Sequence, residues 1–342
     1  MKHMISAVPF DPHRRGALAL LANSLAGIAL SGIVAGTAGA ADVWPTRTVR
    51  IIVPFAAGGP ADSAARVLAD VMAPQLGQPV VVENRPGAGS AFGVVAAAQS
   101  RDGHTLLVAS NSMVINPALN PSVGYDVGRD FDAVGMVAAQ PLMLVVPSNS
   151  EIKSFSDLIT RYKGKADELT ASNSGIGTLA HLTSEIFTAE TGVPLTPVPY
   201  KGESTLLPDL ISGRVSLGFL NLPSVAPLVK EGKLRGLGVS SEAPVPELPD
   251  VPTFRSLNYP SLEVQGWSML VAPKGTIPAE GLARLEDLLA RALKAEAVQT
   301  RLAALNQTPV VQSRQATADF LKAEEKRYGA IIKAQNIRPQ QP

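Results

Sequence analysis

One segment near the start of the chain, RIIVPFAAGGPADSAARVLADVM at residues 50–72, constrains the fold more than any other. Its apolar beginning, together with the preceding valine, predicts a buried strand over Val49–Val53. Two adjacent glycines then predict a turn, and Asp62 or Ser63 is suited to cap a helix over 63–75. A strand that leads through glycines into a helix start directs backbone N–H groups at open space, where an anion is favoured. The segment therefore predicts an anion site.

A second segment, LTASNSGIGTLAHL at 169–182, repeats this order of elements. A possible strand at 169–172 leads through a turn with two glycines into a predicted helix over 178–191. Helix N-termini carry about half a positive charge and several unpaired N–H groups, so two of them across a cleft would hold one acidic ligand from both sides. The alternative is that both turns are ordinary strand-to-helix connections with structural roles only.

Short apolar runs alternate with helical patterns along the rest of the chain, which is typical of α/β architecture with a largely parallel sheet. The 342 residues suffice for two domains, and the 46% apolar content allows a packed core. Further strands are predicted at 80–82, 105–109, 134–138, 142–146, 215–220, 234–239 and 264–271. Further helices are predicted at 91–98, 154–162, 204–211, 278–293, 297–305 and 316–334.

Composition and motifs exclude several kinds of site. The net charge of +1, without a dense run of Lys or Arg, argues against a nucleic-acid partner. The chain has no cysteine, and His104 and His181 alone do not make a zinc site. Glycines at 87–93 have the spacing G-x-G-x-x-x-G, which is not the dinucleotide fingerprint, and no nucleophile elbow, phosphate loop or H-E-x-x-H motif occurs. The sequence predicts a protein that is not an enzyme and that holds no metal and no cofactor.

The first 41 residues have the pattern of a signal peptide. Lys2, Arg14 and Arg15 precede an apolar stretch at 16–35, and small residues at 38–40 form an A-x-A-like cleavage site. We therefore expect export and removal of residues 1–41. A membrane anchor is the alternative, because the apolar stretch is long enough to span a bilayer. The Arg14-Arg15 pair leaves both the twin-arginine route and general secretion open.

The remaining chemistry is that of binding by neutral donors. Glycine N–H groups and neutral side chains can neutralise a carboxylate by hydrogen bonds, each of which contributes about 1.5–3 kcal/mol. Several together reach the roughly 8 kcal/mol that micromolar binding requires. The candidate side chains are Ser110, Asn111, Ser112, Ser174, Thr178, Tyr200 and Asn221.

A series of motifs along most of the chain after residue 41 follows the order of one known family. They are W-P at 44–45, the first segment as far as Asp62, V-V-V-E-N-R-P-G-A-G at 80–89, D-G-H-T-L-L at 102–107, N-P at 116–117, Y-D at 125–126, D-F at 130–131, S-G-I-G-T at 174–178, H-L at 181–182, V-P-Y-K-G at 198–202, G-K-L-R at 232–235 and L-P-D-V-P-T at 248–253. On these residues the chain resembles the Bug/TctC-type extracytoplasmic solute-binding receptors of tripartite tricarboxylate transporters.

The resemblance implies a periplasmic-binding-protein fold of type II, a two-lobed "Venus flytrap" with the ligand in the cleft between the lobes. Lobe 1 would comprise residues 42–146 plus 265–342, and lobe 2 residues 147–264. The implied function is capture of a small organic acid in the periplasm, by a monomer, for delivery to membrane transporter subunits. The alternative is a ligand-sensing receptor of the same fold that acts on a signalling partner.

The resemblance also implies which residues contact the ligand. Ser110, Asn111 and Ser112 would act together with the first turn on lobe 1. The complete implied set is Phe55, Gly58, Gly59, Asp62, Ser110, Asn111, Ser112, Ser174, Gly177, Thr178, His181, Tyr200 and Asn221. From its position alone, the sequence favours a structural histidine at position 181 over one that faces the cleft.

Two residues depart from the family's pattern. Pro60 replaces the usual third glycine of the first turn, which removes one N–H donor but suits a first helical residue. Leu220 stands where many relatives have an aspartate. We expect Leu220 to make the pocket more apolar, which argues against an amino-acid ligand and favours an aliphatic or aromatic carboxylate.

Overall fold

The computed structural model describes residues 43–337, and the predicted signal peptide at 1–41, with its alternatives, lies outside this range. The chain divides after Val43, so the elements below belong to the unit that begins at Trp44. Within the described residues, no helix is both long and apolar enough to cross a bilayer.

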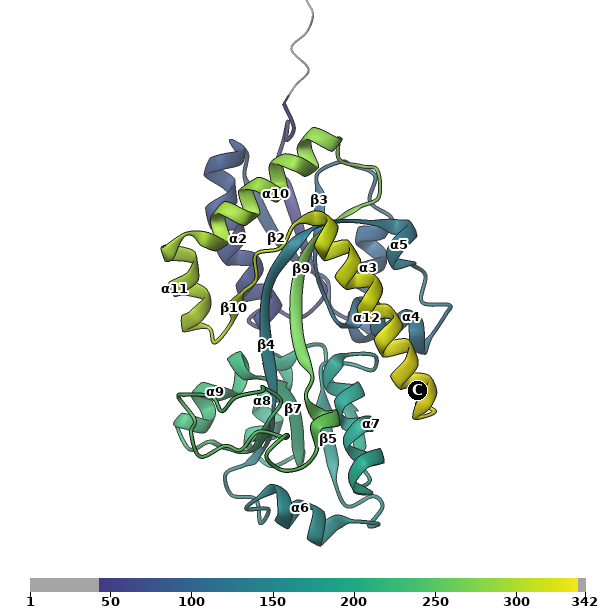
Figure 1. The fold of residues 1–342 in the computed structure, drawn as a ribbon, viewed down its shortest axis with the longest axis vertical. Helices are drawn as coiled ribbons and strands as arrows, with labels where there is room; N and C mark the ends of the chain where they lie inside the picture. The colour runs from purple at the N-terminus through teal and green to yellow at the C-terminus, as the bar shows by residue number, and fades with distance from the viewer. Residues whose placement is uncertain (1–42, 338–342) are drawn as a thin grey trace, which may run out of the picture. The chain divides into compact units, whose positions relative to one another are not determined.

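The strands fall into two groups that share one long strand, β4 (Phe131–Pro147) (Figure 1). The first group forms lobe 1 and the second forms lobe 2. Lobe 1 contains β1 (Val49–Val53), β2 (Val80–Asn84), β3 (Thr105–Ser110), β9 (Gln265–Pro273) and β10 (Thr308–Pro309). Lobe 2 contains β5 (Thr170–Asn173), β6 (Thr196–Pro199), β7 (Leu217–Asn221) and β8 (Leu234–Val239).

The strand β4 changes partners along its length. Its residues 131–141 pair with β9, and its residues 142–147 pair with β7 and β8. The chain returns to lobe 1 at the start of β9, where Gln265 pairs with Pro141. The strand changes partner after Pro141, which is earlier in the chain than the lobe boundary predicted after residue 146. The lobe boundaries stay a prediction.

The sheet is mixed, and the expectation of a largely parallel sheet is wrong. Its strand order is β2-β1-β3-β9-β4-β7-β5-β6, with β10 and β8 also paired to β4. Parallel pairs occur at β1 and β5, where helical crossovers connect the strands. The pairs made by β4 and β9 are antiparallel, because these strands carry the chain into lobe 2 and back.

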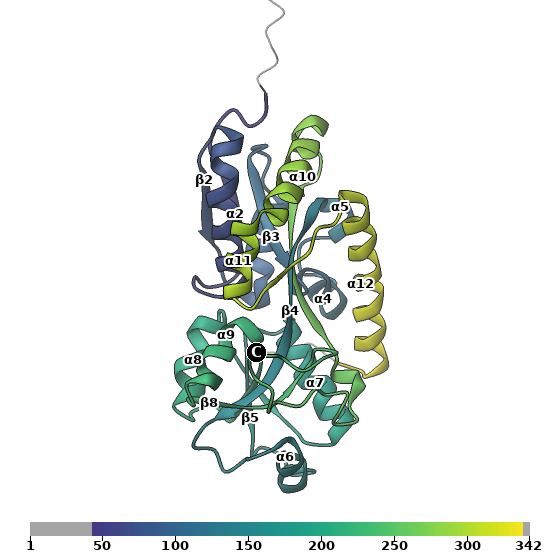
Figure 2. The ribbon, with the colours of Figure 1, turned by 60° about the vertical axis from the view of Figure 1, so that its left-hand side comes forward.

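Helices cover both faces of the strands in each lobe (Figure 2). In lobe 1, one face carries α2 (Pro60–Leu76), α10 (Ala279–Lys294) and α11 (Glu296–Ala304), and the other carries α3 (Ala91–Ala98), α4 (Ser112–Leu119) and α12 (Arg314–Ala334). In lobe 2, one face carries α6 (Phe155–Tyr162) and α7 (Leu179–Thr191), and the other carries α8 (Glu203–Ile211) and α9 (Leu222–Lys230). Short turns of helix are α5 (Val127–Asp130), η2 (Ala88–Ser90) and η3 (Pro260–Leu262).

Alternation along the strands explains this two-faced packing. In β1, Ile51 packs on the α2 side of the sheet, and the neighbouring Ile52 packs on the α3 side. In β7, Phe219 joins the core beside α7, while Leu220 joins the core beside α8 and α9. Successive residues of a buried strand therefore serve different cores.

Two helices of eight or more residues, α4 and α9, were not predicted, and each contains an internal proline. Proline removes a backbone donor and displaces the carbonyl four residues earlier, which then lacks its helical partner. In α4 the carbonyl of Met113, four residues before Pro117, accepts a hydrogen bond from the Tyr125 hydroxyl at 3.1 Å. A tertiary contact thus supplies the partner that the helix cannot.

The helix α2 begins earlier than the sequence predicts. Its N-cap is Gly59 and its first residue is Pro60, so the expected cap at Asp62 or Ser63 is wrong. Asp62 instead lies in the first turn, where its carboxylate accepts from the Gly58 N–H, from Arg66 Nε and from Asn84 Nδ2, each at 2.9 Å. Burial raises the pKa of Asp62, but these hydrogen bonds outweigh burial and hold its pKa below the usual 3.8.

We predict that Asp62→Asn lowers the free energy of unfolding at pH 7 by about 1.5–3 kcal/mol, the range for hydrogen bonds to a charged group. Because the folded-state pKa is below the unfolded value, the carboxylate stabilises the fold above about pH 4. That stabilisation is lost as the pH falls through the folded-state pKa. Urea unfolding between pH 2 and pH 7 measures both effects.

The matched control is Asp70→Asn, on the same helix, which removes an exposed ion pair with Arg301 and should change stability by less than about 1 kcal/mol. If both variants lost the same stability, or if Asp62→Asn kept the wild-type pH dependence, the structural role of Asp62 would be refuted.

Candidate functional site

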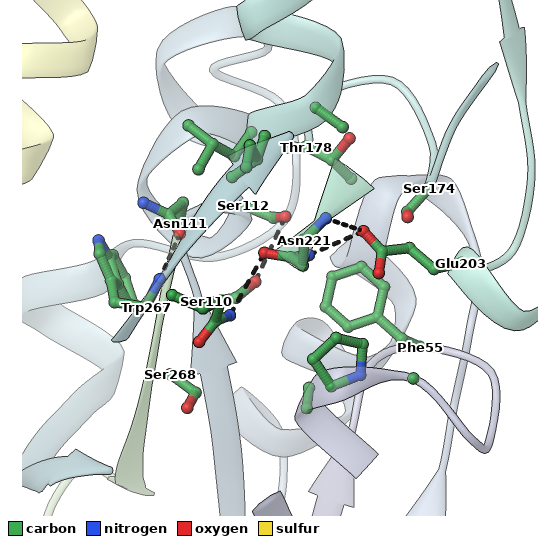
Figure 3. Close-up of a pocket in the computed structure, with 17 residues that line it drawn as sticks. Phe55, Ser110, Asn111, Ser112, Ser174, Thr178, Glu203, Asn221, Trp267 and Ser268 are labelled. Carbon is green, nitrogen blue, oxygen red and sulfur yellow. Dashed lines mark hydrogen bonds between the residues drawn. The ribbon is translucent and has the colours of Figure 1, made fainter. Parts of the chain in front are cut away.

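A pocket lies between the two lobes, beside the shared strand β4 (Figure 3). Its walls combine apolar side chains with hydroxyls, amides and one carboxylic acid. Of the described residues, no Lys, Arg or His lines it, so an anion in the pocket would depend on neutral donors. The lining residues are Phe55, Gly59, Pro60, Ala61, Ser110, Asn111, Ser112, Gln140, Leu142, Ser174, Thr178, Leu179, Ala180, Glu203, Asn221, Trp267 and Ser268.

The start of α2 reaches this pocket from lobe 1 through Gly59, Pro60 and Ala61. Pro60 occupies the first helical position, as the sequence suggested, and has no N–H to offer. The N–H of Ala61 lies in the first turn, where backbone donors have no acceptor within the helix. Gly58 and Asp62 do not line the pocket, because they bond to each other behind the turn.

The start of α7 reaches the same pocket from lobe 2. Thr178 is the N-cap: its hydroxyl donates to the carbonyl of Gly175 at 2.7 Å and accepts from the N–H of His181 at 3.4 Å. Leu179 and Ala180 follow in the first turn and line the pocket. Their N–H groups also lack intrahelical acceptors. The two segments that the sequence singled out as a clamp therefore border one pocket.

Asn111 lines the pocket, but its amide is occupied. Its Nδ2 donates to the carbonyl of Gln265 and to the Tyr328 hydroxyl, and its Oδ1 accepts from the N–H of Trp267, all at 3.0 Å. These bonds fix β9 and α12 against the end of β3. Asn111 thus shapes the pocket and has little left to offer a ligand.

Hydroxyl groups supply further neutral donors. Ser110 donates to Ser112 across a long 3.4 Å contact, so both hydroxyls can turn toward a ligand at little cost. Ser268 is 2% exposed, and its hydroxyl has no hydrogen-bond partner among the described residues. Ser174 stands at the start of the turn before α7 and also lines the pocket.

A chain of hydrogen bonds crosses one wall of the pocket (Figure 3). The backbone N–H and the Nδ2 of Asn221 donate to Oε1 of Glu203 at 2.9 and 2.8 Å, and the Ser224 hydroxyl contacts Oε2 of Glu203. Gln140 Nε2 donates to Oδ1 of Asn221 at 3.3 Å. Burial raises the pKa of Glu203, although the hydrogen bonds from Asn221 and Ser224 oppose this.

Sequence reasoning missed Glu203 and Gln140. An acidic residue in the first turn of a helix, as Glu203 is in α8, is ordinary, because it complements the helix dipole. Gln140 lies inside β4, in a stretch that was predicted to separate two strands. Neither position carries a signal of its pocket-facing side chain.

Leu220 does not line the pocket, so the expectation that it makes the pocket more apolar is wrong. Its side chain is fully buried in the core beside α8 and α9, because residues alternate along β7. The next residue, Asn221, faces the pocket instead. The acid that the pocket does contain comes from Glu203 on another element.

Three further predicted residues lie away from the pocket. A Cβ at Gly177 would lie 1.8 Å from Oδ1 of Asn116, so this glycine permits a close approach of the backbone. His181 is fully buried with neither ring nitrogen hydrogen-bonded within the described chain, and burial lowers its pKa to about 4. The hydroxyl of Tyr200 donates to Asp209 at 2.8 Å. Within residues 43–337, no group of acidic, His or Cys side chains could hold a metal ion.

The two lobes touch at the rim of the pocket. The Ser204 hydroxyl on lobe 2 donates to the Ala57 carbonyl on lobe 1 at 2.8 Å. Gly89 on lobe 1 meets Gly175 and Ile176 on lobe 2 so closely that a Cβ at Gly89 would lie 1.8 Å from the carbonyl oxygen of Ile176. The structure therefore has the lobes closed over the pocket.

Known proteins are similar to this chain in sequence and in architecture. A family model described as the tripartite tricarboxylate transporter family receptor matches residues 64–337. Protein BugT of Bordetella pertussis is 37% identical over 314 residues, which cover 90% of this chain and 96% of BugT.

Two solved structures have the same fold. The periplasmic binding protein BugD matches with a TM-score of 0.82 at 31% identity, covering 87% of this chain and 100% of BugD. The structure of R. palustris Rpa4515 with adipate matches with a TM-score of 0.82 at 33% identity, covering 87% of this chain and 100% of that protein. The predicted two-lobed periplasmic-binding-protein fold is thereby confirmed. The chain belongs to the Bug/TctC family of tripartite tricarboxylate transporter receptors, as its motifs predicted.

Proposed function

We propose that this receptor captures a small organic carboxylate in the periplasm and delivers it to the membrane subunits of a tripartite tricarboxylate-type transporter. The observation that carries the proposal is that the starts of α2 and α7, one from each lobe, border the same pocket. Adipate, a dicarboxylate, is the ligand named for the related Rpa4515 structure. The predicted signal peptide supports export to the periplasm.

The carboxylate would be held by backbone groups rather than by a cation. The N–H groups of Ala61, Leu179 and Ala180 are the first-turn donors at the pocket, and each helix start adds about half a positive charge. The hydroxyls of Ser110, Ser112 and Ser174 would complete the site. Of the other residues implied by the resemblance, Phe55 and Gly59 would contact the ligand.

Four of the remaining implied residues would act indirectly. Asn111 fixes β9, Thr178 caps α7, and Asp62 holds the turn that Gly58 belongs to. The lobes would open by bending at β4, where it changes partners, and close again around the ligand. The closed form would be a monomer in which the surfaces of the two lobes are held in fixed positions relative to each other. This form would be presented to the transporter. Nothing in this mechanism requires a chemical change in the ligand.

We expect small organic acids to raise the melting temperature of the receptor, because a ligand that binds only the folded state adds about 2.7 kcal/mol of stability at a hundred times its Kd. A thermal-shift screen of aliphatic and aromatic carboxylates tests this. The neutral amide of each acid is the matched control and should give no shift. A correctly folded receptor that responds to no acid would contradict the proposal.

We also predict that Gly89→Ala weakens carboxylate binding by about tenfold or more, equivalent to 1.4 kcal/mol, because the added methyl group would collide with the carbonyl of Ile176 and hold the lobes apart. The matched control is Gly77→Ala. Both glycines have a left-handed φ, +58° and +71°, but a Cβ at Gly77 meets nothing within 4 Å.

Both variants should therefore lose stability, and only Gly89→Ala should lose affinity. Calorimetric titration with an acid found in the screen measures the affinity, and small-angle scattering measures closure. Equal affinity in the two variants would show that this contact is not needed for binding.

A further inference from the structure

Building on the proposed carboxylate site, we propose that Glu203 determines specificity: it makes the receptor prefer a carboxylate that also carries a hydrogen-bond donor, an ammonium group above all, over a plain dicarboxylate. The observation behind this is the chain Glu203–Asn221–Gln140 in the pocket wall. The pocket thus contains an acidic side chain next to the donors that would hold the ligand's own carboxylate.

The hydrogen bonds of Glu203 define what it can offer to a ligand. Its Oε1 receives two donors from Asn221, one of them a backbone N–H, so this oxygen is an acceptor. Its Oε2 contacts the hydroxyl of Ser224. If Glu203 carried a proton, that proton would lie in the contact with Ser224 and would not point at a ligand. In either protonation state, Glu203 presents acceptors and no donor to the pocket.

The hydrogen bonds of Glu203 also determine how the side-chain amides of Asn221 and Gln140 are oriented. Because Oε1 of Glu203 cannot donate to Asn221, the side-chain amide of Asn221 must direct its Nδ2 at Glu203 and its Oδ1 at Gln140. Gln140 must then direct its Nε2 at Asn221. This leaves Oε1 of Gln140, a residue only 6% exposed, without a hydrogen-bond partner among the described residues. One acceptor in this wall, beside the carboxyl group of Glu203, is therefore in need of a donor.

A plain dicarboxylate cannot supply that donor. Its second carboxylate would offer no hydrogen-bond donor to Oε1 of Gln140, and where Glu203 is ionised it would also add a like charge beside it. An ammonium group would instead donate up to three hydrogen bonds, and where Glu203 is ionised it would also compensate that charge. The ligand class that fits both sets of groups is an aminocarboxylate, with its carboxylate at the helix starts and its ammonium at Glu203.

Matched ligand pairs test this preference on the wild-type receptor by calorimetric titration at pH 7. Succinate and 3-aminopropanoate differ only in that one carboxylate is replaced by an ammonium group, and adipate and 5-aminopentanoate form a longer pair. We expect the aminocarboxylate of at least one pair to bind tenfold or more tightly than its dicarboxylate. If the dicarboxylates bind as tightly or more tightly in every pair, the specificity proposal is overturned and the carboxylate receptor stands. Binding of neither kind of acid would count against the proposed function itself.

The variant Glu203→Gln separates the role of this side chain from that of the fold. We expect it to reduce the aminocarboxylate preference tenfold or more while it retains or improves dicarboxylate binding. The control is Glu231→Gln, which removes the same charge from an exposed site paired with Lys233 and should keep the wild-type preference. An unchanged preference in Glu203→Gln would refute the role of Glu203. Since the wild-type ligand pairs need no variant, the ligand class is tested even if Glu203→Gln folds poorly.

Discussion

The pairing of β4 with β9 on one side and with β7 and β8 on the other is the constraint on which the rest of this structure depends. It brings Gln140 and Leu142 of β4 to the pocket together with Trp267 and Ser268 of β9. It also sets the two lobes so that a helix start from each borders that pocket. The site is therefore a product of strand pairing, because neither lobe contains all of it.

Much of this architecture follows from local sequence. The strand Val49–Val53 and the helices after the two glycine-containing turns are present because apolar spacing and turn residues agree there. The long strand β4 was expected as two strands, since Gln140 and Pro141 interrupt its apolar run. Only its change of partner after Pro141 explains why one strand continues through them. The helix α4 was not predicted, and in it the Tyr125 hydroxyl, from outside the helix, binds the carbonyl four residues before Pro117.

The candidate site was predictable in its backbone and less so in its side chains. Both turns reach the pocket, since a helix start is placed by the strand before it. The direction of a side chain depends on distant partners: Asp62 turns to Arg66 and Asn84, and Tyr200 turns to Asp209. Glu203 faces the pocket because Asn221, from another element, binds its carboxylate. No local pattern contains such information.

We propose that one carboxylate is held by the starts of α2 and α7 from opposite lobes. The most direct measurement is a crystal structure of the receptor with an acid found in the thermal-shift screen. We predict carboxylate oxygens about 2.7–3.2 Å from the backbone nitrogen of Ala61 on one side and of Leu179 or Ala180 on the other. A carboxylate bound elsewhere, or held by one lobe only, would contradict the account.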